Sequence, residues 1–226
     1  MPRTRLRTEI RQDQLVEAAL AVMAEQGRGS LSVAAVARRA GLAPSAIYRH
    51  FPGKQALLDA VVERMRERML GAVAAARAAE PDAIAALRRV HERLLHLVRQ
   101  NRALPRVVLS GDYPVGDRAR RERMLDLLTR FLDALAGIVA DGQRRGRIRS
   151  DVNARSLAVL FLGLFQPAAV LWAMSDGRFD VTRQAREAWP VFEQALRPSD
   201  PASPGAPAVR RRARGSRALR SRRVPA

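Results

Sequence analysis

The chain has 226 residues, of which 47% are hydrophobic, so it can build a core and is not globally disordered. It contains no cysteine, which excludes disulfide scaffolds, thiolate zinc sites and cysteine nucleophiles. Alanine supplies 40 residues and favours helices, while the net charge of +19 favours a polyanionic partner, most simply nucleic acid. No apolar stretch follows the first charged residues as in a secretory signal, and we expect a cytoplasmic protein.

Apolar residues at helical spacing predict four helices in the first part of the chain. The first runs from Thr8 to Gln26 and the second over 32–40, capped by Ser30 or Ser32. Gly41 makes a turn, and a third short helix covers 44–50. A longer helix begins at Lys54. These elements are short, closely spaced and amphipathic.

Helical periodicity continues through the rest of the body. One stripe spans 84–98, and a long helix over 124–138 ends in the Gly142–Gly146 region. Asp151 or Asn153 caps the next helix, and a last helix covers 185–196. No segment shows the sustained alternation of a β-strand. The sequence therefore predicts an all-α protein.

The segment 157–174 is almost continuously apolar and reaches the lower length limit for a transmembrane helix. It stands alone, and Pro167 lies in its middle, so core or subunit interface is the favoured interpretation and membrane insertion the disfavoured one. We predict a homodimer formed through the last two long helices, about 153–174 and 181–196, and no membrane partner.

The second and third helices have the layout of a helix-turn-helix DNA reader, whose second helix enters the major groove. Ile47 and Phe51 are expected to face the core. The outward-facing residues of the third helix would be Pro44, Ser45, Ala46, Arg49 and His50.

The motif LSVAAVARRAGL at 31–42, followed by IYRHFPGK at 47–54 and Leu57-Leu58, closely resembles the N-terminal domain of TetR-family transcriptional regulators. The resemblance covers about residues 10–58 without a gap. Over 59–197 it is one of architecture, including the turn at 142–149, and the segment from 198 onward matches nothing known in the family. One departure is Ala43, where the family often has Ser or Thr, so the third helix lacks a side-chain cap.

The resemblance implies a role for each matching residue. Ser45 and Ala46 would face base edges, and Arg49 would read a base or a phosphate. The residues implied in phosphate contact are Ser32, Tyr48, His50 and Lys54, the last at a helix N-terminus where dipole and ammonium charge converge.

The resemblance and the charge distribution together predict four parts: a basic N-terminal arm (1–9), a helix-turn-helix domain (10–53), a larger helical-bundle ligand-binding and dimerisation domain (54–197), and a disordered Arg-rich tail (198–226). The arm, with Arg3, Arg5 and Arg7, either enters the minor groove or is a solvated terminus. The tail either binds DNA non-specifically or is an inert extension.

The family resemblance further implies a small apolar or amphipathic effector bound in the body. Candidate pocket residues are His91, Tyr113, Phe161, Phe165 and Trp172, each of which also has a plain core or loop interpretation. No catalytic motif, cofactor motif or metal-ligand spacing is present, so we expect no enzyme, no cofactor and no metal. The predicted function is a homodimeric transcriptional regulator of an operator in double-stranded DNA, a repressor released by its ligand; the alternative is an architectural or nucleoid-type DNA-binding protein without an effector.

Overall fold

The computed structural model describes residues 2–26, 31–100, 118–175 and 177–198, and every regular element in these ranges is a helix. The helices are α1 (Pro2–Gln26), α2 (Val33–Arg39), α3 (Pro44–Tyr48), α4 (Lys54–Ala79), α5 (Ala83–Gln100), α6 (Arg118–Arg144), α7 (Ala154–Gly163), α8 (Gln166–Met174) and α9 (Val181–Leu196). The fold is all-α, as the helical periodicity predicts.

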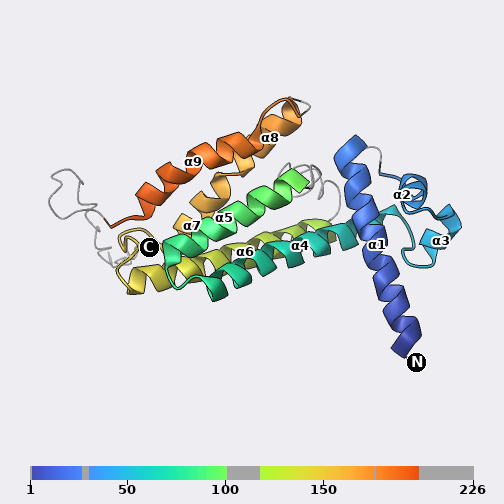
Figure 1. Ribbon diagram of the computed structural model, residues 1–226, viewed down its shortest axis with the longest axis horizontal. Helices are drawn as coiled ribbons and strands as arrows, with labels where there is room; N and C mark the ends of the chain where they lie inside the picture. The colour runs from blue at the N-terminus through green and yellow to red at the C-terminus, as the bar shows by residue number, and fades with distance from the viewer. Residues whose placement is uncertain (1, 27–30, 101–117, 176, 199–226) are drawn as a thin grey trace, which may run out of the picture.

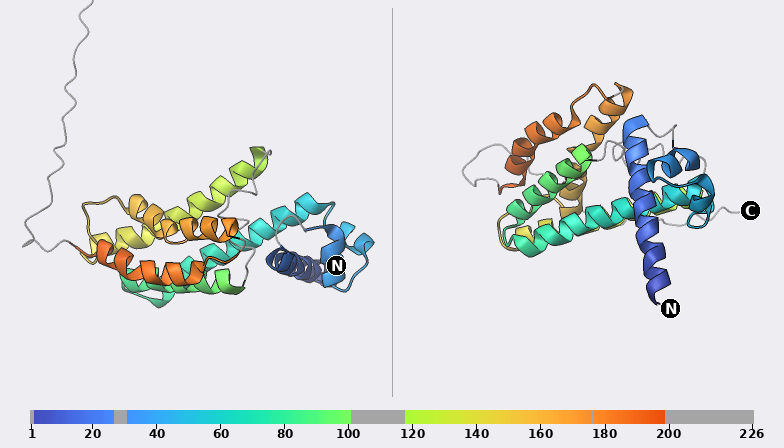
Figure 2. Two further views of the ribbon diagram at one scale, coloured as in Figure 1. Left: turned by 90° about the horizontal axis from the view of Figure 1, so that it is seen from above. Right: turned by 45° about the vertical axis from the view of Figure 1, so that its right-hand side comes forward.

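The molecule is elongated, with α1, α2 and α3 gathered at one end (Figure 1). Helix α4 starts beside them and runs into the body, where it packs against α5 and α6. Helices α7, α8 and α9 lie over α5 and α6 on the other side of the body. The right-hand view in Figure 2 shows α1 crossing α4 near the start of α4, so α4 contacts both ends of the molecule.

The small N-terminal unit is held together by apolar side chains from each of its helices. Leu15 and Ala19 of α1 and Val36 of α2 are fully buried. Ile47 and Phe51 are buried as well, as expected for the inward face of the third helix. Burial of this kind, at roughly 25 cal/mol per Å2 of apolar surface, is what keeps such short helices folded, because an isolated helix of this length is unstable in water.

The turn between α6 and α7 is tightly packed and hydrogen-bonded. The Gln143 side-chain amide donates to the carbonyls of Arg149 and Val152, each at 2.8 Å. Asn153 then caps α7 by accepting from the Arg155 N–H at 2.8 Å, as one of the two predicted caps. A Cβ at Gly142 would lie 2.7 Å from both Ala83 Cβ and Ile148 Cδ1, so only glycine lets α6 pass α5 at this distance.

The structure differs from the sequence-based expectation at the N-terminus. Residues 2–9 belong to α1 and do not form a separate arm, so Arg3, Arg5 and Arg7 lie in its first turns. After Pro2 no residue up to Gln26 breaks a helix, and proline is well tolerated in a first turn. The third helix also ends at Tyr48, two residues earlier than expected.

We expected the apolar segment 157–174 to lie in one helix, but the structure divides it into two. Helix α7 ends at Gly163 and α8 begins at Gln166. Pro167 explains the break, because proline lacks the N–H and its ring clashes with the carbonyl four residues earlier. Among the described residues, Ala154–Trp172 is the one stretch long and apolar enough to cross a membrane by length and composition. Tyr113 and the tail from 199 lie outside the described residues.

We predict that Gly142→Ala destabilises the protein, by about 1–3 kcal/mol, because the added methyl group overpacks the contact with Ala83 and Ile148. Gly71→Ala is the matched control: it lies in α4 with nothing within 4 Å of the new Cβ, and we expect it to be neutral or stabilising. Urea unfolding followed by circular dichroism gives both values. Equal midpoints for the two variants would contradict the close-approach argument.

Candidate nucleic-acid interface

Local hydrogen bonds shape the segment from α2 to α3. Ser32 caps α2, its hydroxyl oxygen accepting from the Ala35 N–H at 3.0 Å. Gly41 has a φ of +66°, a left-handed conformation that favours glycine, and reverses the chain after α2. The Leu42 N–H then donates to the Ala37 carbonyl at 2.9 Å. This Schellman-like closure sets the direction in which α3 leaves the turn.

Helix α3 has one buried face and one open face. Ile47 points into the core, whereas Pro44, Ser45 and Arg49 are exposed, and so is Tyr48 at 56%. Ala46 and His50 are half-buried at the edge of the open face. Ala43 provides no side-chain cap, so α3 starts instead with Pro44 in its first turn. The predicted reading residues thus share one accessible surface.

Two further predicted phosphate contacts lie at helix starts. Ser32 precedes α2 and Lys54 is the first residue of α4; both side chains are exposed. Helix N-termini present unpaired N–H groups and a positive dipole, which suits a phosphate oxygen. Because the Ser32 hydroxyl oxygen already accepts from Ala35, a phosphate would receive its O–H hydrogen.

Arg38 and Arg39, which no sequence motif assigned to a site, are exposed at the C-terminal turn of α2. Basic residues are common in the last turn of a helix because they interact favourably with the helix dipole. Their presence there in the sequence therefore does not distinguish a DNA-binding role from a stabilising one. Gln12 was also missed: its amide donates to the His50 carbonyl at 3.4 Å and ties α1 to the end of α3.

Ion pairs connect α1 with α4. The Arg64 guanidinium contacts Asp13 and, at 3.1 Å, Glu17. Arg68 contacts the same Glu17 oxygen at 2.5 Å. Exposed pairs of this type add little stability one by one, but together they orient α1 and α4 relative to each other. A displacement of α4 would therefore also move the N-terminal helices, including α3 with its open face.

In the body, His91 lies in an aromatic cluster. Its ring centroid is 5.0 Å from Phe165, 6.3 Å from Phe161 and 5.0 Å from Trp189. The structure thus brings together three of the five predicted effector residues. Trp172 instead packs beside Gly177 at the end of α8. Trp189 was predicted only as part of the last helix.

His91 is 2% exposed, and neither ring nitrogen completes a hydrogen bond of ordinary geometry. Burial lowers the pKa of His91 from its ordinary 6.5 to about 4, and the Ala185 backbone acts in the opposite direction with a smaller effect. The ring is therefore neutral at physiological pH. Elsewhere in the described chain, no group of three or more His, Asp or Glu side chains is arranged to hold a metal ion.

Two family models match the chain. "Bacterial regulatory proteins, tetR family" matches residues 15–61, and "YsiA-like protein, C-terminal region" matches residues 55–195. The chain belongs to the TetR family. The first match contains the whole α2–α3 surface, and the second covers more than half of the sequence.

Individual proteins resemble this TetR-family chain at lower identity. The nucleoid occlusion factor SlmA of Vibrio vulnificus is 24% identical over 189 residues, 83% of this chain and 96% of that protein. The fatty acid degradation regulator FadR of Bacillus halodurans superposes with a TM-score of 0.70 at 20% identity, covering 82% and 96% of the two chains. FadR of Bacillus subtilis, solved with stearoyl-CoA, gives a TM-score of 0.67 at 21% identity, covering 81% and 98%. These structures establish the TetR-type fold.

We predict that His91 makes the stability of this TetR-family protein depend on pH. Its folded-state pKa lies below the unfolded value, so its contribution is complete above about pH 6.5 and is lost as pH falls towards about 4. At roughly 1.4 kcal/mol per pKa unit, the loss is about 3 kcal/mol. Urea unfolding of wild type and His91→Phe between pH 7.5 and 4.5 measures this loss. As the pH falls, the free energy of unfolding of the wild type should decrease relative to that of the variant.

The control for this titration is His96→Asn, which changes an exposed histidine on the same helix. It should follow the wild-type curve, since the carboxylates that titrate in the same range are common to both proteins. Parallel curves for wild type and His91→Phe would show that folding does not lower the pKa of His91.

Proposed function

We propose that this TetR-family DNA-binding regulator acts in the cytoplasm as a homodimeric repressor that leaves its operator when a small amphipathic effector binds the body. The observation that carries the DNA-binding part is the open face of α3, where Ser45 and Arg49 are exposed while Ile47 and Phe51 anchor the helix from behind. A short, firmly anchored helix with a polar outer face suits the major groove, which is wide enough to admit it.

An uncovered apolar surface supports the homodimer. Of the nine exposed large hydrophobic side chains among the described residues, six lie on α7, α8 and α9: Val159, Leu160, Val170, Leu171, Met174 and Val191. Met174 is 78% exposed and Val191 70%. Apolar side chains gathered in this way on one part of a surface are typical of an interface. These apolar side chains lie on the helices predicted to form the interface. A two-fold axis here would place the apolar surface of one subunit against the same surface of its partner.

Dimerisation gives the DNA reading its geometry. Two α3 helices related by a two-fold axis read two half-sites in successive major grooves, about 34–36 Å apart. The operator is then an inverted repeat. The exposed Ser32 and Lys54 would contact phosphates beside each half-site and fix the register.

The effector part draws on the relatives as well as on the body itself. The Bacillus subtilis FadR structure contains stearoyl-CoA, a long-chain thioester with a charged head, which supports an amphipathic effector here. The coupling would pass through α4, which contacts the body at one end and α1 at the other. A coupling of about 1–3 kcal/mol is enough to empty an operator over a physiological range of effector concentration.

One relative bears on the alternative, an architectural or nucleoid-type role. The Vibrio vulnificus relative is named a nucleoid occlusion factor, which is compatible with a DNA-binding protein that needs no small effector. Selection of bound fragments from a random DNA pool separates the two. An inverted repeat among the selected fragments supports the regulator, and a pool without a common sequence supports the architectural role.

We predict that Ser45→Ala and Arg49→Ala each weaken binding to the selected operator by about 1–3 kcal/mol, roughly 5- to 150-fold, if they contact bases. Binding to unrelated DNA of equal length should change much less. Arg130→Ala is the control, because this exposed arginine of α6 pairs with Asp126 in the body. Fluorescence anisotropy at one fixed salt concentration gives the affinities. An equal loss on both DNAs would place these residues on phosphates and remove the sequence-reading role.

We predict that Leu160→Glu converts the homodimer into monomers, because it places a charge in the middle of the apolar surface of α7. Leu125→Glu is the matched control: Leu125 is also exposed, but it lies on α6, away from the α7–α9 surface. Sedimentation velocity reports the mass of each variant. A Leu160→Glu protein that still sediments as a dimer would show that subunits meet elsewhere.

A further inference from the structure

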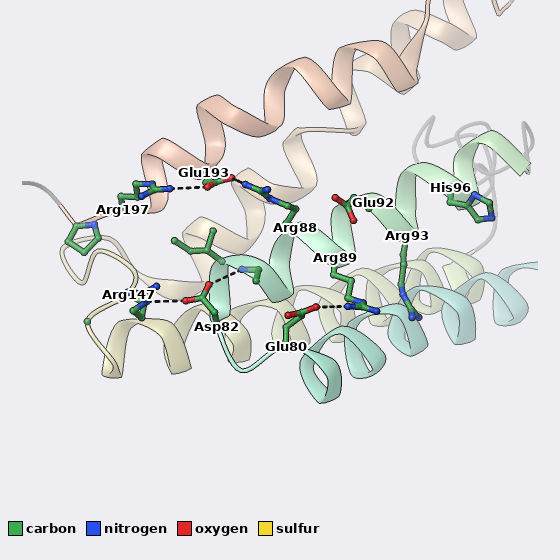
Figure 3. Close-up of a pocket in the computed structure, with 14 residues that line it drawn as sticks. Glu80, Asp82, Arg88, Arg89, Glu92, Arg93, His96, Arg147, Glu193 and Arg197 are labelled. Carbon is green, nitrogen blue, oxygen red and sulfur yellow. Dashed lines mark hydrogen bonds and ion pairs between the residues drawn. The ribbon is translucent and has the colours of Figure 1, made fainter.

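A groove runs along the outside of the body between α5 and α9. Its two adjoining parts have volumes of about 1060 and 790 Å3 and share Arg88, Glu92, His96, Glu193 and Arg197. Figure 3 shows the larger part, where Arg88 and Arg197 approach Glu193 from opposite helices. The two helices run antiparallel here, since 84–88 lies opposite 193–197 and 95–99 opposite 182–186.

The groove contains more positive charge than its own carboxylates neutralise. Glu80, Asp82 and Glu193 are paired with arginines that line the same groove. The remaining charged lining consists of Glu92 and three arginines: Arg93, Arg99 and Arg186. None of these three is within 4.0 Å of a carboxylate in the described part of the chain, and Arg99 and Arg186 line the same, smaller part of the groove. At that end Arg99 and Arg186 outnumber the one carboxylate, Glu92, that is not paired with an arginine of the groove, so the charge there is net positive.

Glu193 keeps the middle of the groove rigid. It accepts hydrogen bonds from Arg88, Arg197 and the Trp189 indole N–H, the last at 2.8 Å. The Arg88 guanidinium carbon also lies 5.9 Å from the centre of the Trp189 ring. These bonds hold the pKa of Glu193 below its ordinary value, first through Arg88. The aromatic wall of the groove is thus preorganised, and preorganised walls cost little on binding.

His91 lies at the floor of the smaller part. It is 2% exposed, and neither ring nitrogen completes a hydrogen bond of ordinary geometry. Leu95, Trp189 and Pro190 surround this floor with apolar surface.

We propose that the smaller part of the α5–α9 groove binds a small amphipathic anion, whose acidic head pairs with Arg99 and Arg186 and whose apolar body lies on Leu95, Trp189 and His91. A planar aromatic carboxylate matches this arrangement of groups. Its carboxylate can pair bidentately with a guanidinium group, and its ring can cover the apolar wall. The candidate pocket predicted from sequence shares only His91 with this groove, because Phe161 and Phe165 pack behind it in the core.

The proposed homodimer leaves this groove open. At about 100° per residue, Thr182, Arg186, Glu193 and Arg197 share one side of α9. Val191 lies on the other side of the buried stripe and belongs to the apolar surface assigned to the partner subunit. A ligand can therefore enter while the subunits remain paired.

This inference rests on the proposed function only for its regulatory output, so binding is measured first without DNA. Equilibrium dialysis of the full chain against 2-naphthoate gives the amount bound, with neutral 2-naphthamide and inorganic phosphate as the two comparison probes. We expect about one 2-naphthoate per chain, bound at least tenfold more tightly than either comparison probe. Equal binding of 2-naphthoate and 2-naphthamide, or of 2-naphthoate and phosphate, would overturn the proposal.

Variants place the ligand within the groove. Arg99→Ala and Arg186→Ala should each weaken 2-naphthoate at least fivefold and leave 2-naphthamide unchanged. Arg183→Ala is the matched control, since it lies on α9 outside the groove and pairs with Glu187. Both arginines are exposed, so their variants are expected to fold. Wild-type binding by both arginine variants would overturn the proposal.

Operator release separates this proposal from the proposed function. Saturating 2-naphthoate that binds the groove but leaves operator affinity unchanged would count against an effector role and keep the groove as a binding site. A protein that binds its operator but takes up no 2-naphthoate would reject the groove and keep the DNA-binding regulator.

Discussion

Helix α4 is the element on which the two ends of the molecule depend. Leu57 and Val61, near its start, are buried in the core, and so are Met69, Val73 and Ala76 further along. Because one uninterrupted helix supplies both sets, the N-terminal unit and the body share a common wall. The ion pairs of Arg64 and Arg68 with Asp13 and Glu17 add orientation at the point where α1 crosses it. These pairs are partly exposed, so they act more on geometry than on stability.

The described part of the structure also shows how a strongly basic chain distributes its charge. Many arginines of the body are paired, for example Arg77 with Asp141 and Arg147 with Asp82, at 2.5 and 3.0 Å. Such residues add to the net charge without creating a binding surface. The surface of α3 and the end of the α5–α9 groove are different, because Arg49, Arg99 and Arg186 there have no carboxylate within 4.0 Å in the described part of the chain. Position therefore says more about partners than the total of +19 does.

Much of this arrangement follows from the sequence, because helical periodicity reports directly on which face is buried. The stripes of α1, α4 and α5, the caps at Ser32 and Asn153, and the inward direction of Ile47 all have local causes. The sequence placed Pro167 in the middle of the apolar segment, but a proline can either kink a helix or end it, and the break between α7 and α8 was therefore not predicted. The first turns of α1 were missed because alternating arginines carry no apolar stripe.

The α5–α9 groove could not be predicted from helical periodicity, for a different reason. It depends on contacts between residues far apart in the chain, such as Arg88 and Glu193, which are 105 positions apart. Trp189 and Phe192 have the spacing of ordinary core residues, and nothing local distinguishes the one that reaches a surface groove from the one that does not. Only the pairing of the two helices reveals it.

The uncapped start of α3 bears on how such a regulator changes over evolution. With no side-chain cap at Ala43, α3 is held by Ile47 and the neighbouring Phe51, both of which face inward. Substitutions at the outward positions therefore leave the fold almost untouched while altering the pattern of donors and acceptors on the surface that is proposed to face DNA. Duplicated copies of such a gene are free to diverge towards new promoters one outward side chain at a time, without passing through unfolded intermediates.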